Sequence, residues 1–268
     1  MEVDYLPSRV EQHIDSIPTL ESSRMRLFRA IQDNGANLEH IEHIISCDPA
    51  IAAKVMKLAN SSFYRHASGH VGMQQALLTI GLEMVKCIAL SMAVIETFES
   101  DTDLFKTLWR HSHAVALTAS SLGKTKGERE WLFTGGLLHD LGRMVFLCKM
   151  PKDYIPLYEC EHSWPDIGLE QEVFLTDHAR VGGILSRKWH FPPEIVDIIA
   201  YHHMPKDRTS ALVCLTDLVI TCLERGLSPD IQGHAAMLSR FLTSEYKDLV
   251  NAIGQRYNTN ISIVENLG

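Results

Sequence analysis

Two adjacent residues, His139 and Asp140, carry the clearest chemical signal in this sequence. They lie in the run Gly135-Gly136-Leu137-Leu138-His139-Asp140-Leu141-Gly142, which is otherwise apolar. Burying an imidazole beside a carboxylate costs free energy unless a partner pairs with both groups. A divalent metal ion is such a partner, because hard and borderline cations bind neutral imidazole and carboxylate ligands. Neighbouring helical residues project about 100° apart, so the pair suits a site with two metal ions.

Further histidines and aspartates stand in apolar or helix-terminal settings elsewhere in the chain. Each has an ordinary alternative when taken alone. His111 could be a hydrogen-bonded core residue, Asp217 a helix cap, and His202-His203 a polar helix end. Their order along the chain is what makes the set a candidate metal site. The predicted ligands are His111, His139, Asp140, His178, His202, His203 and Asp217.

Asp140 and Arg143 are the residues predicted to take part in catalysis, if the site is catalytic. Arg143 follows the His-Asp pair by about one helical turn. A guanidinium at that distance suits a phosphate oxygen, because arginine binds phosphate in a planar, two-point geometry. The alternative interpretation of Arg143 is an ordinary surface arginine that caps a helix.

The elements that must position these residues are predicted to be helices. Apolar residues recur at spacings of three and four along nearly the whole chain, and alternating strand patterns are scarce. Asp48-Pro49 is typical of a helix start. The polar stretch at residues 99–103 predicts a boundary between parts 1–100 and 101–268, the second ending in a helical tail from about 229. The main predicted helices span roughly residues 37–45, 49–59, 73–80, 82–98, 104–122, 130–147, 167–174, 177–188, 193–201 and 210–225.

The composition excludes several classes of protein. Hydrophobic residues make up 46% of the 268 residues and charged residues 22%, which predicts a packed globular core. The net charge of -8 without a dense Lys/Arg cluster argues against nucleic acid as a partner. Six scattered cysteines without a C-x-x-C pair predict reduced thiols. The acidic start and the lack of a long apolar run predict a soluble, cytoplasmic protein that does not enter a membrane.

Several motifs together resemble the HDOD group, the bacterial signal-output relatives of the HD phosphohydrolases. The resemblance covers about residues 6–225. It implies an all-α fold in which an N-terminal helical bundle packs on a C-terminal HD-like helical bundle. The motifs that carry it are Asp48-Pro49-Ala50-Ile51, Leu58-Ala59-Asn60-Ser61-Ser62-Phe63-Tyr64, Gly136 to Gly142 and Trp189-His190-Phe191-Pro192.

The seven predicted ligands also match, residue by residue, the ligand order of the related HD-GYP phosphodiesterases. HDOD relatives usually look like HD domains that have lost ligands and catalysis, so this chain retains more than is usual. It departs from HD-GYP enzymes at three places. Met204-Pro205-Lys206 replaces the Gly-Tyr-Pro segment, Thr107 stands where some of these enzymes have an acidic residue, and Arg143 replaces a lysine.

The resemblance implies two functions that the sequence leaves open. The favoured one is a regulatory module that presents a surface to signalling proteins, with or without bound metal. The alternative is a metal-dependent phosphohydrolase or phosphodiesterase that acts on a nucleotide or cyclic nucleotide at a dinuclear site. The predicted site binds one or two ions, and iron, manganese, zinc and nickel all suit its His and Asp ligands. In the dinuclear reading, one metal is bound by His111, His139, Asp140 and Asp217, the second by His178, His202 and His203, and Asp140 bridges the two.

Overall fold

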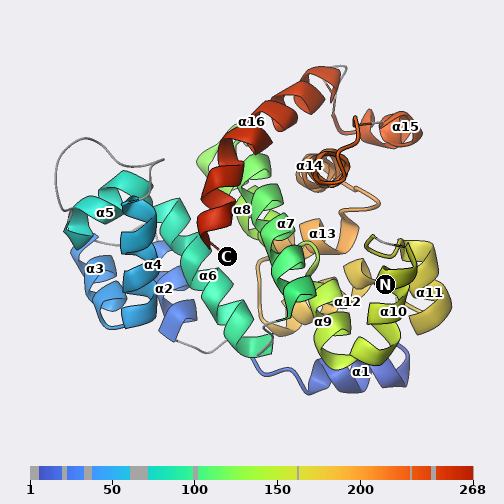
Figure 1. Ribbon diagram of the computed structural model, residues 1–268, viewed down its shortest axis with the longest axis horizontal. Coiled ribbons are helices and arrows are strands. Elements are labelled where there is room, and N and C mark those ends of the chain that lie inside the picture. The colour runs from blue at the N-terminus through green and yellow to red at the C-terminus, as the bar shows by residue number, and fades with distance from the viewer. Residues whose placement is uncertain are drawn as a thin grey trace. The chain divides into compact units, whose positions relative to one another are not determined.

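A computed structural model shows an all-α protein (Figure 1). It describes residues 6–19, 23–32, 38–60, 72–98, 102–161, 163–229, 231–242 and 246–267. Within these ranges the structure contains helices and no strand, so the predicted fold class is confirmed. The cysteines whose side chains are described are free thiols.

The chain divides into two compact units. The large unit contains Met1–Pro18 and Asp101–Ile261, and the small unit contains Thr19–Ser100 and Ser262–Gly268. The described residues 6–18 group with the second half of the chain. Helix α1 (Ser8–Asp15) packs on α9. Lys188 Nζ donates to Ile14 O at 2.9 Å and Trp189 Nε1 donates to Pro18 O at 3.0 Å, which fastens this segment to the large unit.

In the part of the small unit that the structure describes, five helices make up most of the chain. Asp48 caps α4 by accepting hydrogen bonds from the backbone N–H groups of Ala50 and Ile51, as the Asp-Pro pattern predicts. Gly81, at φ +80°, allows the chain to turn sharply between α5 and α6. Residues 61–64 and 99–101, which belong to predicted features, lie outside the described ranges. The helices are α2 (Ser23–Gln32), α3 (Leu38–Ser46), α4 (Pro49–Ala59), α5 (Met73–Ile80) and α6 (Leu82–Phe98).

The large unit is built around α7 and α8, which pack along one another, and α12, which packs against both α9 and α13 (Figure 1). Helix α14 packs against α7, α8 and α13. Besides α1, the helices are α7 (Asp103–Ser120), α8 (Lys126–Leu138), α9 (Leu141–Lys149), α10 (Pro151–Glu161), α11 (Ile167–Phe174), α12 (His178–Lys188), α13 (Pro193–Tyr201), α14 (Arg208–Glu224), a short 3₁₀ turn (Gln232–His234), α15 (Ala235–Leu238) and α16 (Tyr246–Leu267).

Close approach of α9 and α12 depends on Gly142. A Cβ placed on Gly142 would lie 2.0 Å from the backbone oxygen of His178, far inside van der Waals contact. Glycine is therefore the residue that lets the first turn of α9 lie against the first turn of α12. This contact brings Asp140 and His178 to the same place in the large unit.

Among the described residues, no single helix is both long enough and apolar enough to cross a membrane. Helix α5 and residues Met84–Phe98 of α6 reach that length and composition only as a pair, which is bent by 105°.

Candidate metal centre

His139 and Asp140 lie at a break between two helices. The sequence predicts one continuous helix over residues 130–147, and this prediction is wrong. Helix α8 ends at Leu138, Asp140 adopts φ -93° and ψ 20°, and α9 begins at Leu141. Both side chains are buried, with 0% and 4% of their surface exposed. The break turns α9 toward α12, where Gly142 meets His178.

Three histidines are oriented by hydrogen bonds from their Nδ1 atoms. His139 Nδ1 lies 2.7 Å from Gly136 O, and His202 Nδ1 lies 2.7 Å from Ile199 O. His178 Nδ1 lies 2.6 Å from Glu170 Oε2. Carbonyl and carboxylate oxygens only accept hydrogen bonds, so each Nδ1 carries the proton. A neutral ring then presents an Nε2 lone pair, the arrangement that outer partners impose on metal-binding histidines.

The Nε2 atoms of these three histidines converge on Asp140. His139 Nε2 lies 3.4 Å from Asp140 Oδ2, while His178 Nε2 and His202 Nε2 lie 3.4 Å and 3.9 Å from Oδ1. His178 Nε2 is also 3.2 Å from His202 Nε2 and 2.8 Å from His203 Nε2. His203 Nε2 can donate a hydrogen bond to His178 Nε2. His202 in its neutral form cannot, because its Nδ1 holds the only ring proton.

The arrangement of these side chains is more favourable with a bound cation than without one. Two lone pairs that face each other, as on His178 and His202, repel unless positive charge lies near both. His139 Nε2 is buried and has no hydrogen-bond partner among the described residues, which is costly for a polar atom. A divalent ion held by His139 and Asp140 would remove the second cost, and one held by His178 and His202 would remove the first. The donor set is the one expected for a borderline metal.

His111 and Asp217 adjoin the same cluster. His111 Nε2 lies 3.0 Å from Asp217 Oδ1, and that oxygen lies 3.8 Å from His139 Nε2. His111 Nδ1 contacts Glu224 Oε2 at 2.8 Å. The structure thus brings all seven predicted ligands together. Two groups have ligand atoms within 4.8 Å of one another: the first is His111, His139 and Asp140, and the second is His178, His202 and His203.

Electrostatics divide the histidines into two kinds. Burial lowers the pKa of His202 well below its usual value, aided by the neighbouring histidines. Burial and His178 lower the pKa of His203 to about 3. Burial also opposes protonation of His111, but Glu224 and Asp217 outweigh it and raise its pKa. Despite burial, Arg143 and the nearby histidines hold the pKa of Asp140 well below its usual range, so His202 and His203 are neutral and Asp140 is ionised at neutral pH.

Arg143, the other residue predicted to take part in catalysis, is buried beside Asp140. It is only 6% exposed, which rules out a surface arginine. Its Nε donates to Asp140 Oδ1 at 2.8 Å, and its Nη1 donates to Tyr154 Oη at 3.0 Å, Pro165 O at 2.8 Å and Glu170 Oε1 at 3.3 Å. Arg143 therefore fixes the orientation of Asp140, and only Nη2 has no hydrogen-bond partner among the described residues.

Two carboxylates of this site, Glu170 and Glu224, were not predicted from the sequence. Glu170 is fully buried and connects Arg143, Tyr154 and His178. Glu224 contacts His111 from the last turn of α14. Glu170 lies in the segment Glu170-Gln171-Glu172, whose polarity is typical of a solvent-facing turn, so no local signal marks it. A carboxylate that acts through a histidine eight residues away is recognisable only after the chain folds.

The centre opens into a cavity of about 450 Å³. Four of the lining side chains are carboxylates and two are arginines, so the cavity favours positive charge. Its lining includes Asp140, Asp166, Asp217, Glu224, Arg143 and Arg225.

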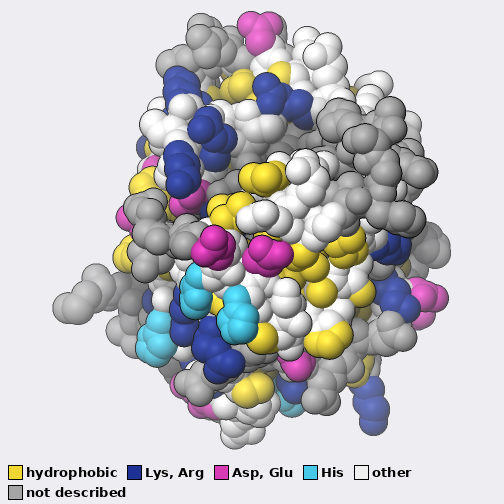
Figure 2. Space-filling view, turned by 90° about the vertical axis from the view of Figure 1, so that its left-hand side faces the viewer, with side chains coloured by type: hydrophobic (Ala, Val, Ile, Leu, Met, Phe, Trp, Pro, Cys, Tyr) yellow, Lys and Arg dark blue, Asp and Glu magenta, His cyan; other side chains and the backbone are white. Residues whose placement is uncertain are grey.

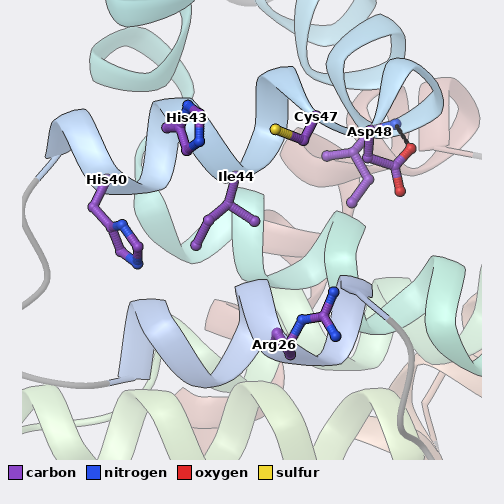
Figure 3. A pocket seen from close by; sticks show the side chains of 7 residues that line it. Arg26, His40, His43, Ile44, Cys47 and Asp48 are labelled. Atoms are coloured by element: carbon purple, nitrogen blue, oxygen red, sulfur yellow. Dashed lines mark hydrogen bonds between the residues drawn. The ribbon is translucent and has the colours of Figure 1, made fainter.

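The small unit has a cavity of its own, of about 370 Å³, between α2 and α3. Arg26 extends from α2, and His40 and Ile44 extend from α3 toward it (Figure 3). His40, His43 and Cys47 are exposed, and among the described residues they do not form a metal-binding group. On one face of the molecule, histidines lie beside Lys or Arg side chains and near hydrophobic ones (Figure 2).

Comparison with known proteins agrees with this architecture. The class that the fold and site define is an all-α protein with an HD-type cluster of histidines and aspartates. The HDOD domain model matches residues 17–205, so the chain belongs to the HDOD domain family. An uncharacterised protein of Treponema pallidum (strain Nichols) is 28% identical over 203 residues, which cover 74% of this chain and 40% of that protein. The chain therefore spans well under half the length of this curated relative.

Solved structures share the fold. A candidate phosphohydrolase from Shewanella amazonensis SB2B matches with a TM-score of 0.75 at 19% identity, covering 99% of this chain and 100% of the other. An HDOD domain protein of unknown function from Geobacter sulfurreducens matches with a TM-score of 0.70 at 21% identity, over 96% and 95%. A candidate signal transduction protein from Marinobacter aquaeolei VT8 matches with a TM-score of 0.73 at 16% identity, over 97% and 65%.

Proposed function

We propose that this protein is an HDOD signal-transduction module that binds divalent metal in its large unit. The observation that carries the proposal is the convergence of the Nε2 atoms of His139, His178 and His202 on Asp140. Hydrogen bonds on the far side of each ring fix that orientation. Metal binding at such a site stabilises the fold, because the binding free energy adds to the free energy of unfolding.

A regulatory role is supported by the family and by features of the site. The segment after His203 is Met204-Pro205-Lys206 instead of Gly-Tyr-Pro. Most of the hydrogen-bonding capacity of Arg143 is used by protein oxygens. The neighbour from Marinobacter is described as a signal transduction protein. The proposal therefore includes signalling proteins as partners, no nucleic acid, and action in the bacterial cytoplasm.

The test is metal content with matched variants. Wild-type protein, His139→Ala and His178→Ala are loaded with Mn²⁺, Fe²⁺ or Zn²⁺, desalted and measured by elemental analysis. The control is His40→Ala, because His40 is exposed and lies in the small unit. Wild type and the control should retain one or two ions per chain, and the site variants should retain less. Equal metal content in all four proteins, or none in wild type, would contradict the proposal. Circular dichroism establishes that each variant is folded.

A second candidate function, metal-dependent phosphohydrolysis, is favoured by the cavity at the centre. His111, Asp140, His203 and Asp217 all line that space of about 450 Å³, so a small molecule can reach the ligand cluster. A metal ion bound there supplies Lewis-acid chemistry to a phosphate ester. The residues of the chain contribute charge and orientation: Arg143 orients Asp140, and Glu170 orients His178. Two S. amazonensis proteins of similar fold are described as candidate phosphohydrolases.

Hydrolysis is tested with metal-loaded protein and a panel of nucleotides, cyclic nucleotides, cyclic dinucleotides and aryl phosphates. Turnover that wild type shows and Asp140→Asn lacks supports this function. Activity that is equal in wild type and Asp140→Asn, or absent from both, would exclude it and leave the non-catalytic module.

A further inference from the structure

A second cavity of the large unit reaches the histidine cluster by another route. Its volume is about 580 Å³, within the usual range for small-molecule sites. His203 lines both this cavity and the one of about 450 Å³. We call it the basic cavity. Its lining residues come from α11, α12 and α13 and from the segments next to α12 and α13. They include Asp177, Arg180, Arg187, Tyr201, His203, Met204 and Lys206.

Charge distinguishes the two cavities. The basic cavity is lined by three cationic side chains, Arg180, Arg187 and Lys206, all exposed, and by one carboxylate, Asp177. That carboxylate is already engaged: it accepts from Arg180 N at 2.9 Å and from Gln171 Nε2 at 2.8 Å. The other cavity has four carboxylates and two arginines. In the absence of metal, the charge therefore favours an anionic ligand in the basic cavity over one in the other cavity.

The basic cavity also has an apolar wall. Met204 is 75% exposed and Tyr201 is 38% exposed, so both present apolar surface at the cavity. The Lys206 ammonium lies 4.6 Å from the centre of the Tyr201 ring and 2.7 Å from Asp197. This contact keeps a cation beside the aromatic surface. Cations next to an exposed ring and thioether suit a ligand with an anionic group and an organic part.

We propose that the basic cavity binds a phosphate-bearing small molecule of nucleotide size. Arg180 and Arg187 contact the phosphate, because guanidinium groups match its geometry. Tyr201 and Met204 contact the organic part. His203 then lies between the ligand and the metal centre. This inference rests on the proposed function only where it places the ligand next to the proposed metal centre.

The test measures binding of adenosine 5′-monophosphate by isothermal titration calorimetry, with metal-loaded and chelator-treated protein. Arg187→Ala and Arg180→Ala should each weaken binding about tenfold or more, as expected for loss of a charge-assisted hydrogen bond. The matched control is Arg225→Ala, because Arg225 is an exposed arginine that lines the other cavity. It should bind as wild type does. Arg187→Lys should be intermediate, since lysine keeps the charge but not the fork.

The outcomes separate this inference from the proposed function. If chelator-treated protein binds the nucleotide and the Arg187→Ala variant does not, the basic cavity is supported even when elemental analysis finds no metal. If metal binds but no nucleotide binding occurs up to millimolar concentration, the cavity assignment is overturned and the metal centre stands. Equal loss in Arg225→Ala and Arg187→Ala, or no loss in either arginine variant of the basic cavity, also overturns it.

Discussion

Replacing Glu170 with alanine removes the one carboxylate that joins Arg143, Tyr154 and His178. Its Oε2 accepts from His178 N at 2.8 Å and from His178 Nδ1 at 2.6 Å. Its Oε1 accepts from Tyr154 Oη at 2.8 Å and from Arg143 Nη1 at 3.3 Å. The alanine variant leaves a buried guanidinium with one carboxylate fewer and leaves the Tyr154 hydroxyl to find another acceptor.

The expected loss in the free energy of unfolding is about 3–5 kcal/mol, the range for breaking a buried ion pair by removing one partner. Glu170→Gln keeps the shape and one acceptor oxygen, so its loss should be smaller, about 1–3 kcal/mol. Glu172→Ala is the matched control, since Glu172 is exposed on the same helix. It should change stability by less than about 0.5 kcal/mol.

The assay is urea unfolding of metal-free protein, followed by far-UV circular dichroism, with midpoints compared at equal slope. Despite burial, His178 and Arg143 lower the pKa of Glu170. Its stabilisation is therefore present above the unfolded-state pKa of about 4.3 and is lost as pH falls through the folded-state pKa. The wild-type advantage over Glu170→Gln should shrink below about pH 4. A loss under 1 kcal/mol for Glu170→Ala, or one equal to that of Glu172→Ala, would refute this account of the network.

Three other predictions concern the fold and the metal. Gly142→Ala should lose metal affinity and several kcal/mol of stability in urea unfolding, because its Cβ would lie 2.0 Å from His178 O. The control Gly127→Ala should lose neither, because the space at its Cβ position is open. Asp207→Ala should cost about 1 kcal/mol, because Asp207 caps α14 in a capping box with Ser210; a variant as stable as wild type would count against that cap. Chelation should lower the melting temperature by roughly 5–10 °C and re-addition of metal should restore it; an unchanged calorimetric melt would argue that no site is loaded.

The helices and the ligand cluster were predictable because their signals are local. A histidine in an apolar helix, such as His111 or His178, is recognisable from its neighbours alone. The order of these residues along the chain then indicates that they share one centre. The structure brings all seven near one another, and six of them, without Asp217, form two groups of three.

Features that depend on long-range packing were not predictable. The helix break at His139 and Asp140 lies beside the contact of Gly142 with His178, and these two residues are far apart in sequence. The grouping of the first eighteen residues with the large unit follows from hydrogen bonds of Lys188 and Trp189. Likewise, the burial of Arg143 depends on partners such as Tyr154 and Glu170, which lie elsewhere in the sequence.

His139, His178, His202 and Asp140 are the core of the proposed metal centre. The most direct measurement is anomalous diffraction from crystals of manganese- or iron-loaded protein. We predict an anomalous peak about 2.0–2.3 Å from an Asp140 oxygen and from the ligand nitrogens of one or both groups, His111 with His139, and His178 with His202 and His203. Loaded crystals without a peak there, or with a peak only at surface histidines such as His40, would contradict it.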